Sequence, residues 1–214
     1  MTFVATLQIG NTTPYAVEGV RVGKGTVGGA SSTFESLAAQ TSLADWARNL
    51  GWDGQEPLVV VAWSAGVFAL RSWLRRGDDA EIPRLGLLLL DGLHGGSTLG
   101  QCDPGLVSGV VRFGQTLDFD RALVVTATAI KPPYGSTGDC AAYLRRVAPA
   151  ATVIESPGDD AQAHIDQVAR VGPELLRSQL LPWTRGESPG IPGIWFLLGA
   201  GALYLGWRWG RSAK

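Results

Sequence analysis

The sequence is poor in charge, cysteine and histidine. Only 17% of its 214 residues are charged and 45% are hydrophobic, which disfavours a disordered chain. Eighteen basic residues stand against 19 acidic ones, a balance that gives no electrostatic reason to expect nucleic acid as a partner. The composition predicts one folded domain, or one domain with an appendage.

Cysteine is scarce as well. Cys102 and Cys140 are the only two, and neither belongs to a C-x-x-C motif or to a Cys/His metal spacing. This pattern predicts no zinc site and no disulfide framework. We expect both to be small half-buried residues, with a single disulfide as the alternative.

The two ends of the chain differ. Residues 1–10 lack the basic and apolar regions of a secretory signal, and their composition predicts a strand. Residues 188–207 contain no charge, and as a helix they would span roughly 30 Å, about the thickness of the bilayer core. Tryptophans cluster near both ends of this stretch, as interfacial residues do: Trp183, Trp195, Trp207 and Trp209.

We therefore expect a globular domain over residues 1–181, a linker over 182–190, a single membrane-spanning helix over 191–209 and a basic tail over 210–214. A buried C-terminal helix is the alternative. Basic residues after the span predict a cytoplasmic C-terminus, yet no signal explains how the domain would be exported, so the sidedness stays open. The small-x-x-x-small pattern Ala202-x-x-x-Gly206 predicts self-association through the span.

Within the domain, apolar runs alternate with helical patterns. Strands are expected at 3–9, 16–22, 58–62, 85–90, 122–128 and 152–155. Helices are expected from a capping box Ser32-x-x-Glu35 to Leu50, then over 65–76, 137–147 and 161–181, with a break near Gly172-Pro173. The continuous apolar runs indicate strands covered on both faces. The expected fold is a compact three-layer α/β/α sandwich around a mostly parallel sheet, whose ligands bind at the carboxyl ends of the strands.

One turn stands out. The buried run Leu58-Val-Val-Val-Ala62 leads through Trp63-Ser64-Ala65-Gly66 directly into an amphipathic helix. A strand that turns at once into a helix crowds the backbone, so small residues must flank the serine, whose side chain then projects from the sheet edge. Ser64 as a simple helix cap is the alternative.

This motif resembles the nucleophile elbow G-x-S-x-G of the α/β-hydrolase superfamily, with Ala62 in place of the first glycine. The resemblance extends over roughly residues 3–181 in the order of elements and implies a minimal member of that fold. It implies Ser64 as nucleophile and the Ala65 N–H as an oxyanion donor. Gly10, after the first strand, matches the position of the second donor.

A serine nucleophile needs a base, and the sequence has two histidines. His164 follows the last expected strand, which is the position of the histidine in the family order. His94 follows another strand and is interpreted as a rim or substrate-contacting residue, or as a plain loop residue. Trp63 and Asn11 are further candidates for substrate contact.

The acid has two candidates. Asp91 ends the strand of four leucines, where a half-buried carboxylate requires partners. Asp139 stands where most of the family places the acid, but Ser136-x-x-Asp139 resembles a capping box, which already gives Asp139 a structural role. We favour Asp91.

These residues predict a serine hydrolase that cleaves carboxylic esters, with thioesterase and peptidase left open. No metal or organic cofactor is implied. The insertion 92–121 is expected to be an irregular loop and no helical lid, which suggests an open site for an ester or acyl substrate that is lipid-borne or polymeric. The rival hypothesis is a non-catalytic α/β-hydrolase-like domain, tethered to a membrane for binding or assembly.

Overall fold

The sheet is built entirely of parallel strands. The computed structural model describes residues 1–96, 100–133 and 135–187. Its six strands lie in the order β2-β1-β3-β4-β5-β6, and all neighbouring strands are parallel. They are β1 (Thr2–Leu7), β2 (Val20–Thr26), β3 (Leu58–Trp63), β4 (Leu85–Leu90), β5 (Arg121–Ala127) and β6 (Thr152–Glu155).

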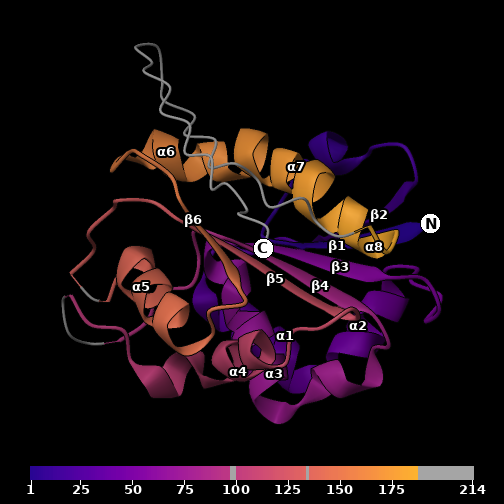
Figure 1. Cartoon of the computed structure of the whole chain (residues 1–214), viewed down its shortest axis with the longest axis horizontal. Coiled ribbons are helices and arrows are strands. Elements are labelled where there is room, and N and C mark those ends of the chain that lie inside the picture. Colours follow the sequence, from indigo (N-terminus) through magenta and orange to yellow (C-terminus); the bar gives the residue numbers. More distant parts are fainter. Residues whose placement is uncertain (97–99, 134, 188–214) are drawn as a thin grey trace, which may run out of the picture.

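Helices cover both faces of this sheet (Figure 1). One layer contains α1 (Ser31–Gln40), α2 (Leu43–Asn49), α3 (Val67–Arg76), α4 (Pro104–Gln115) and α5 (Thr137–Val147). The other contains α6 (Ala161–Asp166), α7 (Gly172–Leu175) and α8 (Leu181–Thr184), joined by π-helical turns at Gln167–Val171 and Leu176–Leu180. Short 3-10 turns lie at η1 (Thr13–Tyr15), η2 (Ser64–Gly66) and η3 (Asp78–Glu81).

Successive strand residues enter opposite cores. In β3, Val60 and Ala62 pack in the cluster beneath α1–α5, whereas Val59 and Val61 pack with residues of the α7–α8 layer. A strand buried on both faces needs apolar residues at every position. The three-layer α/β architecture expected from the continuous runs is therefore present.

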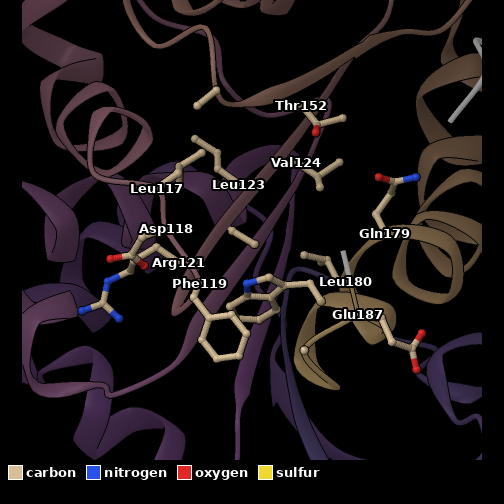
Figure 2. A pocket seen from close by; sticks show the side chains of 14 residues that line it. Leu117, Asp118, Phe119, Arg121, Leu123, Val124, Thr152, Gln179, Leu180 and Glu187 are labelled. Carbon is tan, nitrogen blue, oxygen red and sulfur yellow. The ribbon is translucent and has the colours of Figure 1, made fainter. Parts of the chain in front are cut away.

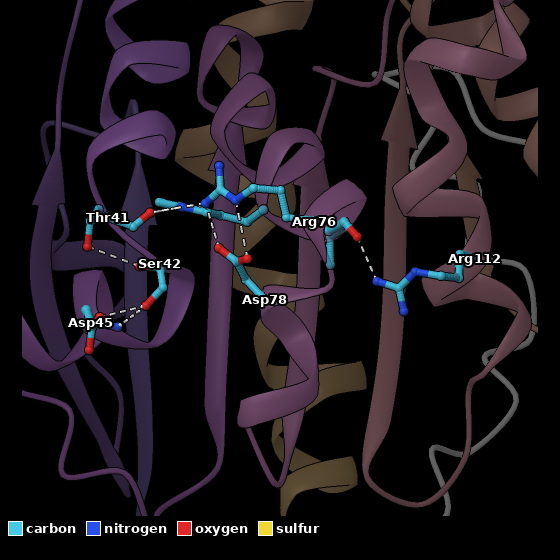
Figure 3. Close-up of polar contacts among 8 residues, drawn as sticks. Thr41, Ser42, Asp45, Arg76, Asp78 and Arg112 are labelled. Atoms are coloured by element: carbon cyan, nitrogen blue, oxygen red, sulfur yellow. Dashed lines mark hydrogen bonds and ion pairs between the residues drawn. The ribbon is translucent and has the colours of Figure 1, made fainter.

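The helix expected from Ser32 to Leu50 is two helices. α1 begins after Ala30 without a side-chain cap, so the predicted Ser32 capping box is wrong. The break lies at Thr41, whose carbonyl accepts hydrogen bonds from Trp73 Nε1 at 2.8 Å and from Arg76 at 3.2 Å (Figure 3). Ser42 then caps α2. These tertiary contacts fix a kink that the local periodicity does not reveal.

Two other expectations need correction. The second strand lies at Val20–Thr26, four residues beyond the expected start. The insertion 92–121 contains the helix α4, which begins at the capping residue Asp103. α4 buries Val107, Val110 and Phe113 in the core, so it belongs to the helical layer and forms no lid.

The last helical run continues without the expected break. Gly172 keeps right-handed helical dihedrals, and a Cβ at that position would lie 2.4 Å from the Tyr15 hydroxyl. The π-helical turn before Pro173 accommodates the proline within the helix. The helix continues to Thr184, and Trp183 is buried, so the globular part extends past residue 181.

Within the described residues, no helix is long and apolar enough to cross a membrane. The predicted span and the basic tail fall on residues 188–214, which lie outside them.

The two cysteines form a disulfide, which corrects the expectation of two separate thiols. Cys102 lies in the loop before α4 and Cys140 lies in α5, with Cα atoms 4.8 Å apart. The bond closes a loop with a sequence separation of 38 and ties the segment after β4 to the helix after β5. Spacing alone could not reveal it, because this contact is tertiary.

Removing this disulfide should destabilise the domain. The double variant Cys102→Ser/Cys140→Ser is expected to lose about 2–4 kcal/mol of unfolding free energy, because a loop of this length constrains the unfolded chain. Urea unfolding measures the loss. A reductant should reproduce it in the wild type and leave the double variant unchanged; equal stability of both proteins would contradict the prediction.

Candidate active site

Three neighbouring strands end in residues with strained backbone. Gln8 follows β1, Ser64 follows β3 and Asp91 follows β4, with φ values of 65°, 50° and 42°. They are the only non-glycine residues with positive φ in the described part of the chain. Such conformations cost of order 1–3 kcal/mol and persist where the surroundings hold them. Since the strands are parallel and adjacent, all three residues lie at one edge of the sheet.

The turn at Ser64 is packed closely on both sides. A Cβ at Gly66 would lie 2.7 Å from the Leu7 carbonyl oxygen of β1. A Cβ at Gly92 would lie 2.5 Å from the Ser64 carbonyl oxygen and 2.5 Å from Val67. Both positions therefore require glycine. The chain passes from β3 through η2 into α3 without a connecting loop, as the elbow motif predicts.

Asp91 and His164 meet at this edge. The Nδ1 atom of His164 lies 2.6 Å from Oδ2 of Asp91, although the residues are 73 positions apart. Asp91 is buried, and His164 lies on α6 with about a quarter of its side chain exposed. A carboxylate at Nδ1 fixes the imidazole tautomer and leaves Nε2 as the basic nitrogen.

Two threonines complete the surroundings of Asp91. Thr128 donates its backbone N–H at 2.9 Å and its hydroxyl at 2.8 Å, and Thr137 donates its hydroxyl at 2.6 Å. Burial alone would raise the pKa of Asp91, but the hydrogen bonds from His164, Thr137 and Thr128 outweigh it and lower that pKa. Asp91 is therefore held as a carboxylate. Sequence reasoning missed both threonines, whose only signal is their position just after β5 and at the start of α5.

Trp63 holds His164 from the other side. Its ring lies 4.8 Å from the imidazole, centroid to centroid, and its Nε1–H donates to the His164 carbonyl at 3.1 Å. Trp63 was expected to contact substrate. The structure shows its contacts with His164, and the substrate contact stays a prediction.

Ser64 is next to Trp63 in the chain and partly exposed. Among the described residues, its hydroxyl makes no hydrogen bond with His164. Such bonds are often long in a free enzyme and shorten only when substrate binds.

Asp139 does not pair with His164. Its Oδ2 atom accepts hydrogen bonds from the backbone N–H of Ser136 at 2.8 Å and from its hydroxyl at 2.7 Å. The Ser136 hydroxyl in turn accepts from the Asp139 N–H, which completes the predicted capping box of α5. Asp139 thus has a structural role away from the histidine.

His94 lies in the loop that follows Asp91. Its carbonyl accepts a hydrogen bond from Arg71 at 2.9 Å, and its ring lies 5.6 Å from the ring of Phe68. Burial, and secondly the charge of Arg71, lower the pKa of His94, so it is neutral at pH 7. His94 therefore lies at the same sheet edge as Ser64, Asp91 and His164.

The early loop after β1 contains Gly10, the expected second oxyanion donor, and Asn11, an expected substrate contact. Gly10 and Asn11 are exposed, and the Asn11 side chain accepts from the Thr13 N–H at 3.1 Å. Gln8 is the residue that directly follows β1, beside the turn at Ser64, and its side chain accepts from the Gly28 N–H at 2.7 Å. Sequence reasoning missed Gln8. Ala65 lies in η2, the turn that leads into α3.

The described residues contain no cluster of three His, Cys, Asp or Glu side chains that could hold a metal ion.

No protein-family model and no curated protein matches the sequence. Among solved structures, the chain is similar to the crystal structure of the lin2722 gene product of Listeria innocua, with a TM-score of 0.51 and 11% identity. The match covers 84% of this chain and 92% of that chain. At this identity the likeness concerns the fold alone.

Filling the space at Gly92 should disturb the elbow. Gly92→Ala is expected to cost about 1–3 kcal/mol of unfolding free energy, because the new methyl group would overlap the backbone of Ser64. Gly29→Ala is the matched control, since nothing lies within 4 Å of its Cβ position. Urea unfolding compares the two variants. Equal stabilities would show that the chain does not pack tightly here.

Proposed function

We propose that this chain is a membrane-anchored serine hydrolase that cleaves carboxylic esters through an acyl-enzyme intermediate. The observation that carries the proposal is the 2.6 Å contact between Asp91 and His164, formed at the sheet edge where Ser64 occupies a strained turn. A buried carboxylate on Nδ1 of a partly exposed histidine is the arrangement that general-base catalysis needs. Two further observations support the proposal: the elbow motif, and the order of Ser64, Asp91 and His164 along the chain.

Each residue has a chemical role in this mechanism. His164 Nε2 takes the proton of Ser64 as its oxygen attacks the ester carbonyl, and Asp91 stabilises the imidazolium that results. The Ala65 N–H, at the start of a helical run, donates to the developing oxyanion. We keep Gly10 as the candidate for the second donor, because the Gln8 N–H already donates to the Thr26 carbonyl at 2.8 Å. His164 then passes its proton to the leaving alcohol, and water repeats the sequence to release the acid.

The proposed substrate class follows from relative reactivity. Thioesters and activated amides react by the same steps. We propose esters as the substrates because a serine nucleophile of this kind cleaves them most widely. The anchor is proposed from the uncharged residues 188–207 alone. Self-association through Ala202-x-x-x-Gly206 belongs to the same hypothesis.

One observation favours the rival hypothesis of a tethered, non-catalytic domain, namely the lack of a hydrogen bond between Ser64 and His164 in the described residues. The catalytic proposal explains more, because a binding domain has no need for four hydrogen bonds on Asp91 or for a strained serine.

Hydrolysis of soluble 4-nitrophenyl esters tests the function. Ser64→Ala is expected to lower kcat by at least about 10³-fold, and Asp91→Asn by about 10³–10⁴-fold, since the amide favours the wrong imidazole tautomer. Asp139→Asn is the matched control: it weakens the capping box of α5 by about one hydrogen bond, about 1 kcal/mol of stability, but should leave kcat within about threefold.

If Asp139→Asn lost activity as strongly as Asp91→Asn, the assignment of the acid would be wrong. If folded wild-type protein hydrolysed no ester, the binding-domain hypothesis would replace the catalytic one. Circular dichroism of each variant separates loss of chemistry from loss of fold.

A further inference from the structure

The described chain ends at the sheet edge opposite the candidate site. Thr184 accepts a hydrogen bond from Thr2, the first residue of β1, at 2.9 Å. The carbonyl of Trp183 accepts one from Arg84, which immediately precedes β4. Both partners stand where strands begin, whereas Ser64 and Asp91 stand where strands finish. The chain therefore leaves the domain at the amino edge of the sheet.

The last helical run separates the site from this exit. It extends from α6, which contains His164, across one face of the sheet to α8 (Figure 1). Thr184 lies 20 positions after His164 in the sequence, which corresponds to roughly 30 Å of helix. The length of the strands gives an independent measure of the distance between the two edges of the sheet, since six residues of β3 span about 20 Å.

The surface around the exit carries both apolar and charged side chains: exposed Phe119 stands between exposed Asp118 and Asp120, and Arg185 and Glu187 form an exposed ion pair. A groove of about 350 Å³ opens there, and Phe119, Trp183 and Leu180 line it beside Glu187, the last described residue (Figure 2). Phe119 is 62% exposed and Met1, at the same edge, is 79% exposed. The groove is too small for residues 191–209 as a helix, whose cylinder would occupy roughly 2,000 Å³. The headgroup region of a bilayer suits such a mixture of aromatic and charged side chains better.

The disulfide bears on the sidedness of the domain. Disulfides persist outside the reducing cytosol, so the Cys102–Cys140 bond favours a non-cytoplasmic domain. The basic residues after the predicted span, Arg208, Arg211 and Lys214, independently favour a cytoplasmic C-terminus. Both observations assign the domain to the same side.

Resting on the proposed function and its anchor, we infer that the domain stands on the non-cytoplasmic face with its site turned away from the bilayer. Its substrate is then an acyl ester presented from the space beyond the membrane, not a lipid ester of the anchoring bilayer. In the opposite orientation, with the site facing the lipid, the chain exit at Glu187 would stand roughly 30 Å above the bilayer surface. The four residue steps from Glu187 to residue 191, where the predicted span begins, reach at most about 14 Å. This is too short to bridge that distance.

The test uses the full chain reconstituted in phosphatidylcholine vesicles, with the domain outside. One fluorogenic acyl ester is offered in three forms: dissolved, coupled to a soluble polymer, and attached to a lipid of the same bilayer. The dissolved and polymer forms should be hydrolysed at least tenfold faster than the bilayer form, relative to the rates of detergent-solubilised protein. The comparison between the dissolved and the polymer-coupled ester shows whether the site prefers a small or a polymeric substrate.

A linker variant makes the test specific. A flexible Gly/Ser insertion of 30 residues after Glu187, with a root-mean-square length of about 30 Å, should raise hydrolysis of the bilayer ester about tenfold. The dissolved ester should react unchanged, and Ser64→Ala should abolish all rates. Fast hydrolysis of the bilayer ester by the wild type, or no effect of the insertion, would overturn the inference.

Two further outcomes have distinct meanings. Protein that hydrolyses the dissolved ester but does not float with the vesicles would overturn the anchor and this inference, and leave the hydrolase intact. Protein that binds vesicles and hydrolyses no form of the ester would overturn the proposed function itself.

Discussion

The hydrogen bond between Asp91 and His164 is the contact on which the candidate site depends. It joins the end of β4 to α6, the first turn of a helical run that covers the far face of the sheet. A buried carboxylate is costly unless it is fully hydrogen-bonded, and here Thr128, Thr137 and His164 supply the donors. The disulfide supports the same arrangement, because it anchors the helix that begins with Thr137.

Backbone strain has a common cause at this edge. Each of the strands β1, β3 and β4 must change direction within one residue, and the space is filled by backbone from its neighbours, as the contacts of Gly66 and Gly92 show. Such turns lower stability and fix side chains in place. They are concentrated on one edge, and the amino edge has no strained non-glycine residue in the described chain; strained residues commonly cluster in this way at functional sites.

Local patterns in the sequence predicted most of the elements. Leu85–Leu90, Thr137–Val147 and Thr152–Glu155 have the expected bounds, because apolar runs and a capping box are local signals. The kink at Thr41, the disulfide and the threonines around Asp91 could not be predicted, since each depends on residues distant in the chain. The tight turn at Ser64 was predicted because its signal, a serine between small residues after an apolar run, lies within five consecutive residues. Gln8 was missed because positive φ at a glutamine leaves no trace in the sequence.

The most direct test of the central claim is covalent labelling of Ser64. Full-length protein in detergent is treated with a fluorophosphonate, and the modified peptide is identified by mass spectrometry. We expect one adduct, on Ser64, formed much more slowly in His164→Ala and in Asp91→Asn. A folded protein that forms no adduct, or one labelled equally fast without His164, would contradict it.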